Sequence, residues 1–405
     1  MRFSTLATAA LINGASATFK FGEQEALAAA AVFNIGLNAA QNGYPSPDTC
    51  TLKNVRVRRE WSTLSKNEKL NYIDAVKCIH EKPALTPSSI AAGAKSRFDD
   101  FVVTHIQQTY WVHGTVITIF RSQPVQHVDQ AQANFLAWHR YYIWAYEQLL
   151  RDECGYTGYL PYHNWAWWAE DPSKSPLLDG SETSIGGDGE YIAGRNYTCV
   201  GQISTCYIKL QPGQGGGCIK SGPVANWTTS LGPIDTKWPN IKKNPSADGL
   251  GYNPRCLSRD LTRDASIGAT DEIISDLIKN SKDIHTFQNL IQGDFPNKYI
   301  GVHSAGHYTI GGDAGTDFFN SPSDPYFYFH HAQIDRIWWI WQNQDIKNRQ
   351  YALADTLTFL NLPPSRNGTL DDNMSLGSMF EAQFPNITQR DAMSTLAGPF
   401  CYIYA

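Results

Sequence analysis

Apolar residues recur at helical spacing in several segments of this chain. Ser65, with Glu68 three positions later, forms a capping-box pattern, and apolar residues at 70, 73 and 76 follow it, which predicts a helix of about twelve residues before Cys78. Three further segments carry apolar residues on more than one face, as buried helices do. We expect these helices at residues 90–110, 134–151 and 328–343.

Two stretches lack this periodicity. Residues 18–48 show little patterning and end in the Gly- and Pro-containing segment 43–47, which cannot continue a helix, so we interpret them as a pro-segment or N-terminal arm. Residues 172–268 are rich in Gly, Pro and Asn and predict long loops. Four cysteines, from Cys199 to Cys256, lie in that stretch and would pin it by cross-links.

Composition predicts a protein with a large core. Hydrophobic residues make up 42% of the 405 residues and aromatic residues 12%, which excludes a disordered chain. The net charge of -5 argues against nucleic acid or an anionic membrane as the main partner and favours a small or neutral substrate. Beyond the N-terminus no apolar run approaches the ~20 residues of a membrane span. The oligomeric state is not predicted.

Cysteine usage and the N-terminus both indicate a secreted protein. The eight cysteines form an even set without a CxxC pair, a pattern typical of disulfides, although their connectivity stays open. Arg2 precedes a short apolar run and residues 15–17 resemble a cleavage site, so we expect a signal peptide at 1–17. Glycosylation sequons, consistent with a glycoprotein, occur at Asn196, Asn226, Asn367, Asn373 and Asn386.

The eleven histidines are clustered, and this clustering is the main chemical signal. His303 and His307 lie one helical turn apart, where two imidazoles can share one metal, and the lack of a Glu after His303 excludes the zinc-protease motif. Two sets of three imidazoles on four helices would hold two metals in a bundle core. Nitrogen-only ligation favours copper or zinc. The candidate ligands are His105, His113 and His139 in one cluster, and His303, His307 and a third imidazole from the His330–His331 pair in the other.

These segments resemble the tyrosinase and catechol oxidase family of type-3 copper proteins, most of all its short secreted fungal members. The resemblance covers residues 50–404, which suggests one domain at 49–405. It rests on Arg58-Arg59-Glu60-Trp61, on Trp138-His139-Arg140, on Asp324-Pro325-x-Phe327 followed by His331 and Asp335, and on Tyr402-x-Tyr404. The family pattern selects His331 as the ligand, and His330 becomes its neighbour.

The resemblance implies a mainly α fold, with a four-helix bundle core around two copper ions and long disulfide-pinned loops. It implies an enzyme that oxidises o-diphenols (catechols) to o-quinones, with a small phenol and O2 as partners. The close alternative is a tyrosinase with monophenol hydroxylase (monooxygenase) activity. An oxygen carrier of the haemocyanin kind, or a structural glycoprotein with incidental histidines, would belong to a different class.

Several other residues bear on the predicted site. Glu147 and Asp335 are interpreted either as acceptors that orient imidazole N–H groups or as partners of Arg140 or Arg336. Ser304 follows the first ligand of the second copper, where many monophenol-active members carry Asn, and this difference favours diphenol oxidation. His163 replaces a Trp of the family pattern and is expected to be structural.

The spacing between His113 and His139 departs from the family. It is 26 residues, and removing residues 116–132 would reduce it to nine, the family's spacing. Because every Val codon begins with GT and one Gln codon is CAG, these seventeen codons, from Val116 to Gln132, could be a retained 51-nucleotide intron. The alternative is a genuine loop, in which His127 would replace His113 as a ligand.

Overall fold

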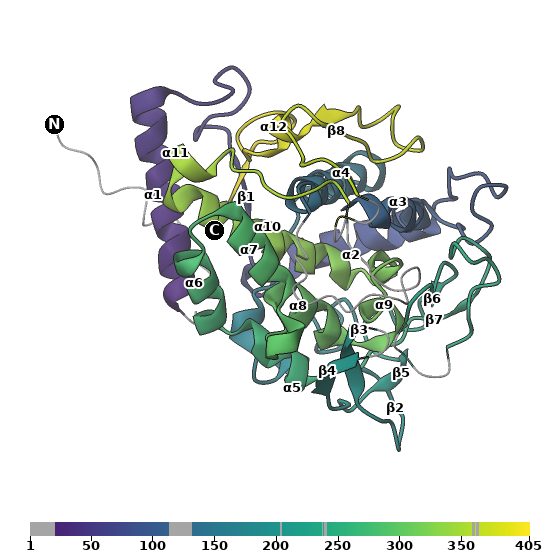
Figure 1. Cartoon of the computed structure of the whole chain (residues 1–405). Helices are drawn as coiled ribbons and strands as arrows, with labels where there is room; N and C mark the ends of the chain where they lie inside the picture. The colour runs from purple at the N-terminus through teal and green to yellow at the C-terminus, as the bar shows by residue number, and fades with distance from the viewer. Residues whose placement is uncertain are drawn as a thin grey trace.

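Long helices occupy the centre of the structure, and short strands lie around them (Figure 1). The computed structural model describes residues 21–112, 132–202, 205–236, 238, 241–358, 361 and 364–405. The longer helices are α1 (Glu23–Asn42), α2 (Lys66–Glu81), α3 (Arg97–Val112), α4 (Phe135–Cys154), α6 (Asp271–Asn280), α7 (Ile284–Gln292), α8 (Val302–Ile310) and α10 (Tyr326–Gln344). One-turn helices are α5 (Arg263–Ser266), α9 (Gly312–Gly315), α11 (Ile346–Arg349) and α12 (Gln389–Ala392).

The strands of the described residues pair two by two. Parallel pairing joins β1 (Arg56–Arg58) to β10 (Tyr402–Tyr404), and the remaining pairs are antiparallel. These are β2 (Gly189–Tyr191) with β5 (Gly216–Ile219), β3 (Thr198–Gln202) with β4 (Thr205–Leu210), β6 (Thr228–Thr229) with β7 (Arg255–Cys256), and β8 (Asn373–Met374) with β9 (Ile387–Thr388).

Disulfides stabilise the parts of the chain that have little secondary structure. The predicted loop region 172–268 holds only short strands, and the bridges Cys199–Cys206 and Cys218–Cys256 lie within it. The bridge Cys78–Cys154 joins α2 to α4. The bridge Cys50–Cys401 joins the segment before β1 to the segment before β10. All eight cysteines are therefore paired, which confirms the prediction of disulfides.

All four helices predicted from the apolar pattern are present. Ser65 caps α2 through the amide of Glu68, whose carboxylate accepts the Ser65 amide in return, so the predicted capping box is confirmed. Helices α4 and α10 lie within three residues of their predicted bounds, and α8 carries His303 and His307. Across the described ranges, no helix is both long and apolar enough to cross a membrane.

The predicted start of α3 was wrong. The helix begins at Arg97 rather than at residue 90 because Ser96 and Asp99 cap it there. The Ser96 hydroxyl accepts the Asp99 amide at 3.2 Å, and the Asp99 carboxylate accepts the amides of Lys95 and Ser96, both at 2.9 Å. These bonds satisfy amides that have no partner inside a helix, so the chain enters α3 at that point.

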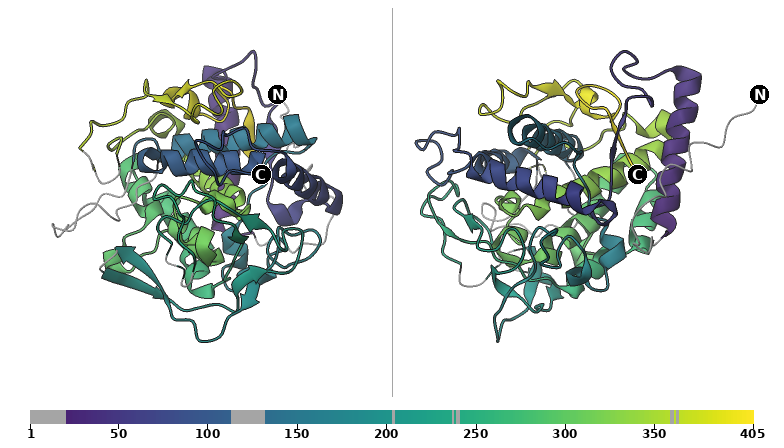
Figure 2. Two further views of the ribbon diagram at one scale, coloured as in Figure 1. Left: turned by 90° about the vertical axis from the view of Figure 1, so that its right-hand side faces the viewer. Right: turned by 180° about the vertical axis from the view of Figure 1, so that it is seen from behind.

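The sequence analysis also missed α1, α6 and α7. Helix α1, purple in Figures 1 and 2, runs along one edge of the core against α10 and α6. Its Glu25 carboxylate accepts a hydrogen bond from the buried Arg336 guanidinium at 2.7 Å, and Gln24 links Asn164 to Gln333. The alanines at 26 and 28–31 favour a helix. Residues 23–42 are thus an integral layer of the fold.

Strands β1 and β10, which are far apart in the sequence, both reach Asp335 on α10. Arg140 Nε on α4 donates to Asp335 Oδ1 at 2.6 Å, and the hydroxyls of Tyr402 and Tyr404 on β10 donate to Oδ2 at 2.6 Å each. Arg58 on β1 lies 3.6 Å from the same oxygen. Asp335 therefore joins α4, α10, β1 and β10 in the interior.

Replacing Asp335 by Asn should strongly destabilise the protein. The change leaves two buried arginines facing a neutral group, and breaking a buried ion pair costs about 3–5 kcal/mol of unfolding free energy. Denaturant unfolding of the metal-free protein measures the loss. The exposed carboxylate of Asp371, paired with Arg390 at the surface, is the matched control, and Asp371→Asn should leave the midpoint unchanged. Equal effects of the two variants would contradict the role given to Asp335.

Candidate metal centre

Four helices bring five of the six predicted ligands together. His105 comes from α3, His139 from α4, His303 and His307 from α8, and His331 from α10. Helix α4 packs against both α3 and α10, and α8 packs against α10. The rings of His139 and His331 are nearly parallel with centroids 4.4 Å apart, and the His105 and His139 centroids are separated by 5.9 Å. All five side chains are buried.

The sixth predicted ligand, His113, and the alternative ligand His127 lie outside the described residues, as does most of segment 116–132. The structure describes the chain on either side, where α3 ends at Val112 and α4 begins at Phe135. Ala133 is anchored by a hydrogen bond from its amide to the Thr356 carbonyl at 3.1 Å.

The imidazoles of α8 and α10 have the geometry of ligands to one metal. Nε2 of His303 and Nε2 of His307 are 3.1 Å apart, which two nitrogens bound at about 2.0–2.1 Å to a common ion can span. The ring nitrogens of His303, His307, His330 and His331 include one from each that all lie within 4.8 Å of one another. His330 was interpreted from the sequence as a neighbour and not as a ligand, yet one of its ring nitrogens lies within 4.8 Å of those of the three predicted ligands.

The outer nitrogens of three predicted ligands are held by acceptors. Nδ1 of His105 donates to the Phe319 carbonyl at 2.8 Å, and Nδ1 of His139 to the Phe135 carbonyl at 2.7 Å. Nδ1 of His303 donates to Oε1 of Gln292 at 2.7 Å. Because these oxygens only accept, the proton stays on Nδ1, and Nε2 is the nitrogen that can bind a metal.

Burial keeps these imidazoles neutral. Desolvation lowers the pKa of His105 to about 4 and that of His307 to about 3. Desolvation, reinforced by the neighbouring imidazoles, also lowers the pKa values of His139, His303 and His331 well below 6.5. Since only the neutral ring binds a metal, the cluster is ready for metal ions at neutral pH.

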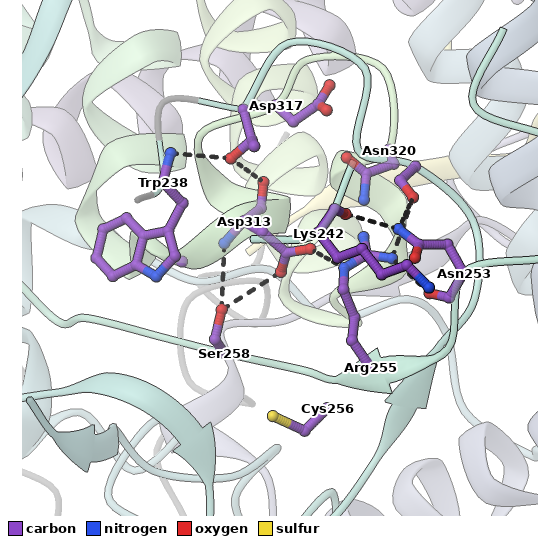
Figure 3. A network of polar contacts seen from close by, with 12 residues as sticks. Trp238, Lys242, Asn253, Arg255, Cys256, Ser258, Asp313, Asp317 and Asn320 are labelled. Carbon is purple, nitrogen blue, oxygen red and sulfur yellow. Dashed lines mark hydrogen bonds and ion pairs between the residues drawn. The ribbon is translucent and has the colours of Figure 1, made fainter. Parts of the chain in front are cut away.

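A polar network fixes the loop that presents the Phe319 carbonyl to His105 (Figure 3). Arg255 on β7 donates through Nε to Asp313 on α9, which also accepts from the Ser258 hydroxyl. Asp317 accepts the Phe319 amide at 2.9 Å and the amides of Ile234 and Asp235. The loop around Phe319 is therefore tied to residues far away in the sequence.

Asp335 binds Arg140, one of the two arginines expected for this pair of carboxylates, and it also lies near Arg58 and accepts from the two tyrosines described above. Glu147 binds a different arginine: its Oε2 accepts from Arg58 Nε at 3.0 Å and from the Leu160 amide at 2.7 Å, while the expected Arg336 pairs with Glu25. The acceptors of His105, His139 and His303 are other residues. Glu147 and Asp335 hold the helices that carry the ligands, and they do not orient the rings directly.

Two further residues singled out from the sequence have definite partners. The buried His163 contacts the Ser175 hydroxyl through Nε2 at 3.0 Å and the Tyr326 hydroxyl through Nδ1 at 3.4 Å. These contacts fit the structural role expected for it. The Ser304 hydroxyl donates to the Gln292 carbonyl at 2.8 Å. Gln292 was not identified from the sequence, because a single glutamine eleven residues before His303 carries no recognisable motif.

Helix α8 contains a glycine where His330 leaves no room for a side chain. A Cβ atom on Gly306 would lie 2.2 Å from both Cε1 and Nδ1 of the His330 ring. Both nitrogens of His330 are buried and have no hydrogen-bond partner among the described residues, as expected for a ring packed for its shape or awaiting a further group.

The donor set fits copper. Five buried, neutral imidazoles converge from four helices, and none of the grouped ligand atoms in the described residues belongs to a carboxylate or thiolate. Nitrogen donors of this type suit copper and disfavour magnesium, calcium or carboxylate-bridged iron.

Comparisons with known proteins agree with this geometry. Residues 95–344 match the family profile described as the common central domain of tyrosinase. The chain is 44% identical over 331 residues to the tyrosinase-like protein orsC of Emericella nidulans, covering 79% of this chain and 83% of that protein. It is 36% identical over 352 residues to tyrosinase P of Aspergillus terreus, covering 86% and 91%.

Among solved structures, a single-site variant of polyphenol oxidase from Thermothelomyces thermophila is similar over nearly the whole chain. The TM-score is 0.84 at 38% sequence identity, and the match covers 95% of this chain and 98% of that one.

Replacing Gly306 by Ala should disturb the metal centre. The new methyl group must displace the His330 ring, and such overpacking costs about 1–3 kcal/mol of unfolding free energy. We expect fewer than two coppers per chain by elemental analysis and a lower unfolding midpoint. Gly36→Ala on α1 is the control because its nearest neighbour would be 3.9 Å away, so it should raise stability by about 0.5–1 kcal/mol. A Gly306→Ala protein that is fully copper-loaded and equally stable would show that the packing is adaptable.

Proposed function

This chain belongs to the tyrosinase family, and on that premise we propose that it is a secreted oxidase that converts o-diphenols to o-quinones with O2. The observation that carries the proposal is the convergence of buried, neutral imidazoles: those of α8 and α10 form one cluster, and ring contacts join His139 on α4 and His105 on α3 to it. This chain has a helical fold with four disulfides, and its family and its histidine cluster indicate a type-3 pair of copper ions. What we propose is which of the family's activities this chain has.

The ligand helices are proposed to act as a four-helix bundle around the two ions. His105, His139 and His113 would hold the first copper, and His303, His307 and His331 the second. When bound, the copper pair supplies the redox chemistry that couples the reduction of O2 to the oxidation of the phenol. Overall, two diphenols and one O2 give two o-quinones and two waters.

The residues around the metals set the conditions for that reaction. The acceptors at Phe319, Phe135 and Gln292 keep the rings in the tautomer that binds metal, and burial excludes water from the centre. The Arg140–Asp335 ion pair connects the residue after His139 with a residue one turn beyond His331. It therefore holds α4 and α10 in register while substrate and product exchange.

Ser304 supports the preference for diphenols. Its hydroxyl is engaged with the Gln292 carbonyl, and it is too short to place an amide group beside the first ligand of the second copper. A diphenol requires no hydroxylation, so the site can oxidise it without a group that helps to deprotonate a monophenol. Monophenol hydroxylation is therefore the alternative that the test below must exclude.

Secretion is supported by the cross-links and by the surface. Four disulfides form most readily in an oxidising compartment. The asparagines of all five sequons, at 196, 226, 367, 373 and 386, are exposed and so accessible to glycosylation. The proposed signal peptide, 1–17, lies outside the described residues. Within segment 18–48, the buried polar contacts of helix α1 support the N-terminal arm over the alternative of a removable pro-segment.

The purified protein should oxidise catechol much faster than it hydroxylates a monophenol. Copper content and O2 uptake with catechol and with a monophenol, measured side by side, test this in the protein without residues 116–132, for which we expect two coppers per chain. Ser304→Asn should raise the monophenol rate relative to the diphenol rate, because it introduces an amide beside His303.

Other outcomes would point to other functions. A monophenol rate equal to the catechol rate would identify a tyrosinase-type hydroxylase. Two coppers with reversible O2 binding and no catechol turnover would indicate an oxygen carrier. A chain without stoichiometric copper would contradict the whole proposal.

We also propose that residues 116–132 are a retained intron. A variant without them should bind two coppers and oxidise catechol, because His113 and His139 would recover a nine-residue spacing and each must bring a nitrogen to within about 2 Å of one ion. The full-length chain should bind less copper. Sequencing the complementary DNA decides directly: transcripts that keep the 51 nucleotides and encode a fully active protein would establish a genuine loop and make His127 a candidate ligand.

A further inference from the structure

Gln292 contacts two neighbouring residues of the second copper site at once. Its side-chain Oε1 accepts Nδ1–H of His303 at 2.7 Å, and its main-chain carbonyl accepts the hydroxyl of Ser304 at 2.8 Å. We propose that Gln292 is the positioning residue of the second copper, and that it sets both the ring of the first ligand and the direction of the Ser304 hydroxyl. This inference rests on the proposed copper enzyme.

A tight connection between two helices brings Gln292 to His303. Gln292 is the last residue of α7, and His303 is the second residue of α8. Between them, Asp294 and Tyr299 exchange backbone hydrogen bonds of 2.7 and 3.1 Å, so the chain folds back on itself. The ends of α7 and α8 thereby become neighbours although eleven residues separate Gln292 from His303.

Two glycines allow this approach. Gly293 and Gly301 have φ values of 118° and 72°, conformations that residues with a Cβ rarely adopt. A Cβ on Gly301 would lie 2.4 Å from the Gly293 nitrogen and 2.6 Å from the Gln292 carbonyl carbon. The backbone at Gln292 is thus in direct contact with the start of α8, and its position is determined by the packing.

The chemical consequence follows from the type of acceptor. His105 and His139 donate to main-chain carbonyls, whereas Nδ1 of His303 donates to a side chain, so this hydrogen bond can be changed by substitution. An amide oxygen fixes the tautomer that has Nε2 facing the metal without adding charge. A carboxylate at this position would accept more strongly and make the ring a better ligand, while an aliphatic side chain would release it.

Gln292 also determines the direction of the Ser304 hydroxyl. Because the Ser304 hydroxyl is bound to the Gln292 carbonyl, it is directed at the backbone of α7. This second contact uses the main chain, so a substitution of the Gln292 side chain separates the two effects. It should change the His303 ligand and leave the Ser304 contact in place.

The test compares Gln292→Leu with Gln292→Glu, using Gln288→Leu as the matched control. Gln288 lies one turn earlier on α7, is buried, and donates to Asp355 at 3.2 Å, so its replacement also removes a glutamine hydrogen bond from this helix. Copper affinity is measured by competition with a chelator. Far-ultraviolet circular dichroism and unfolding of the metal-free proteins report on the fold.

We expect Gln292→Leu to weaken one of the two coppers by about 10- to 100-fold, the usual effect of removing an acceptor behind a histidine ligand. In the presence of chelator its stoichiometry should fall from two coppers to one per chain. Gln292→Glu, which keeps an acceptor oxygen, should retain both coppers. Gln288→Leu should bind copper like the parent, even if it lowers the unfolding midpoint.

Two outcomes would overturn the inference. Parent-like affinity for both coppers in Gln292→Leu would show that His303 needs no such acceptor, and equal losses in Gln292→Leu and Gln288→Leu would reduce Gln292 to a structural role. If the parent binds two coppers but does not oxidise catechol, the proposed oxidase function fails, and the comparison of these variants still decides the role of Gln292.

Discussion

A histidine that binds a metal through Nε2 must give its Nδ1–H to an acceptor, and the centre of this protein is built around that requirement. The imidazoles are buried, so water is a poor source of acceptors, and His105, His139 and His303 each donate to a protein oxygen at a fixed place. His139 finds one a turn earlier in its own helix, at Phe135. His105 and His303 need oxygens from other segments, and the surrounding structure exists in part to place them.

Two different devices provide those oxygens. The Phe319 carbonyl is held by Asp317 and by the network around Arg255, which ties the loop after α8 to strand β7. The Gln292 amide is held by the folded-back connection between α7 and α8, which two glycines permit. The long, poorly patterned loops cross-linked by disulfides therefore contribute to the metal centre, because they help to fix the loop that supplies one of the acceptors.

Charged side chains in the core serve a separate purpose. Asp335 and Glu147 bind arginines that arrive from β1 and α4, and Tyr402 and Tyr404 complete the environment of Asp335. The resulting cluster joins β1, β10 and α4 to the helix that carries His331. A rigid scaffold is necessary here, since a site that holds two ions in a defined relation tolerates errors of only about 1 Å.

Local sequence determined several helices and the ligand types. The Ser65–Glu68 cap, the apolar spacing of α4 and α10, and the pairs and motifs of histidines could all be recognised along the chain, because each depends on residues within a few turns of one another. The cap of α3 at Ser96 and Asp99 is a signal of the same local kind, and the sequence analysis overlooked it. The packing of α1 through Glu25 and Arg336 and the partners of Asp335 could not be recognised, because they depend on contacts between residues tens to hundreds of positions apart. The same is true of the acceptors at Phe319 and Gln292. One is a main-chain carbonyl, which every residue possesses, and the other is an ordinary glutamine at a helix end. Only the tertiary structure selects them, because a hydrogen bond requires two atoms at about 3 Å, and no pattern of residue types specifies that distance.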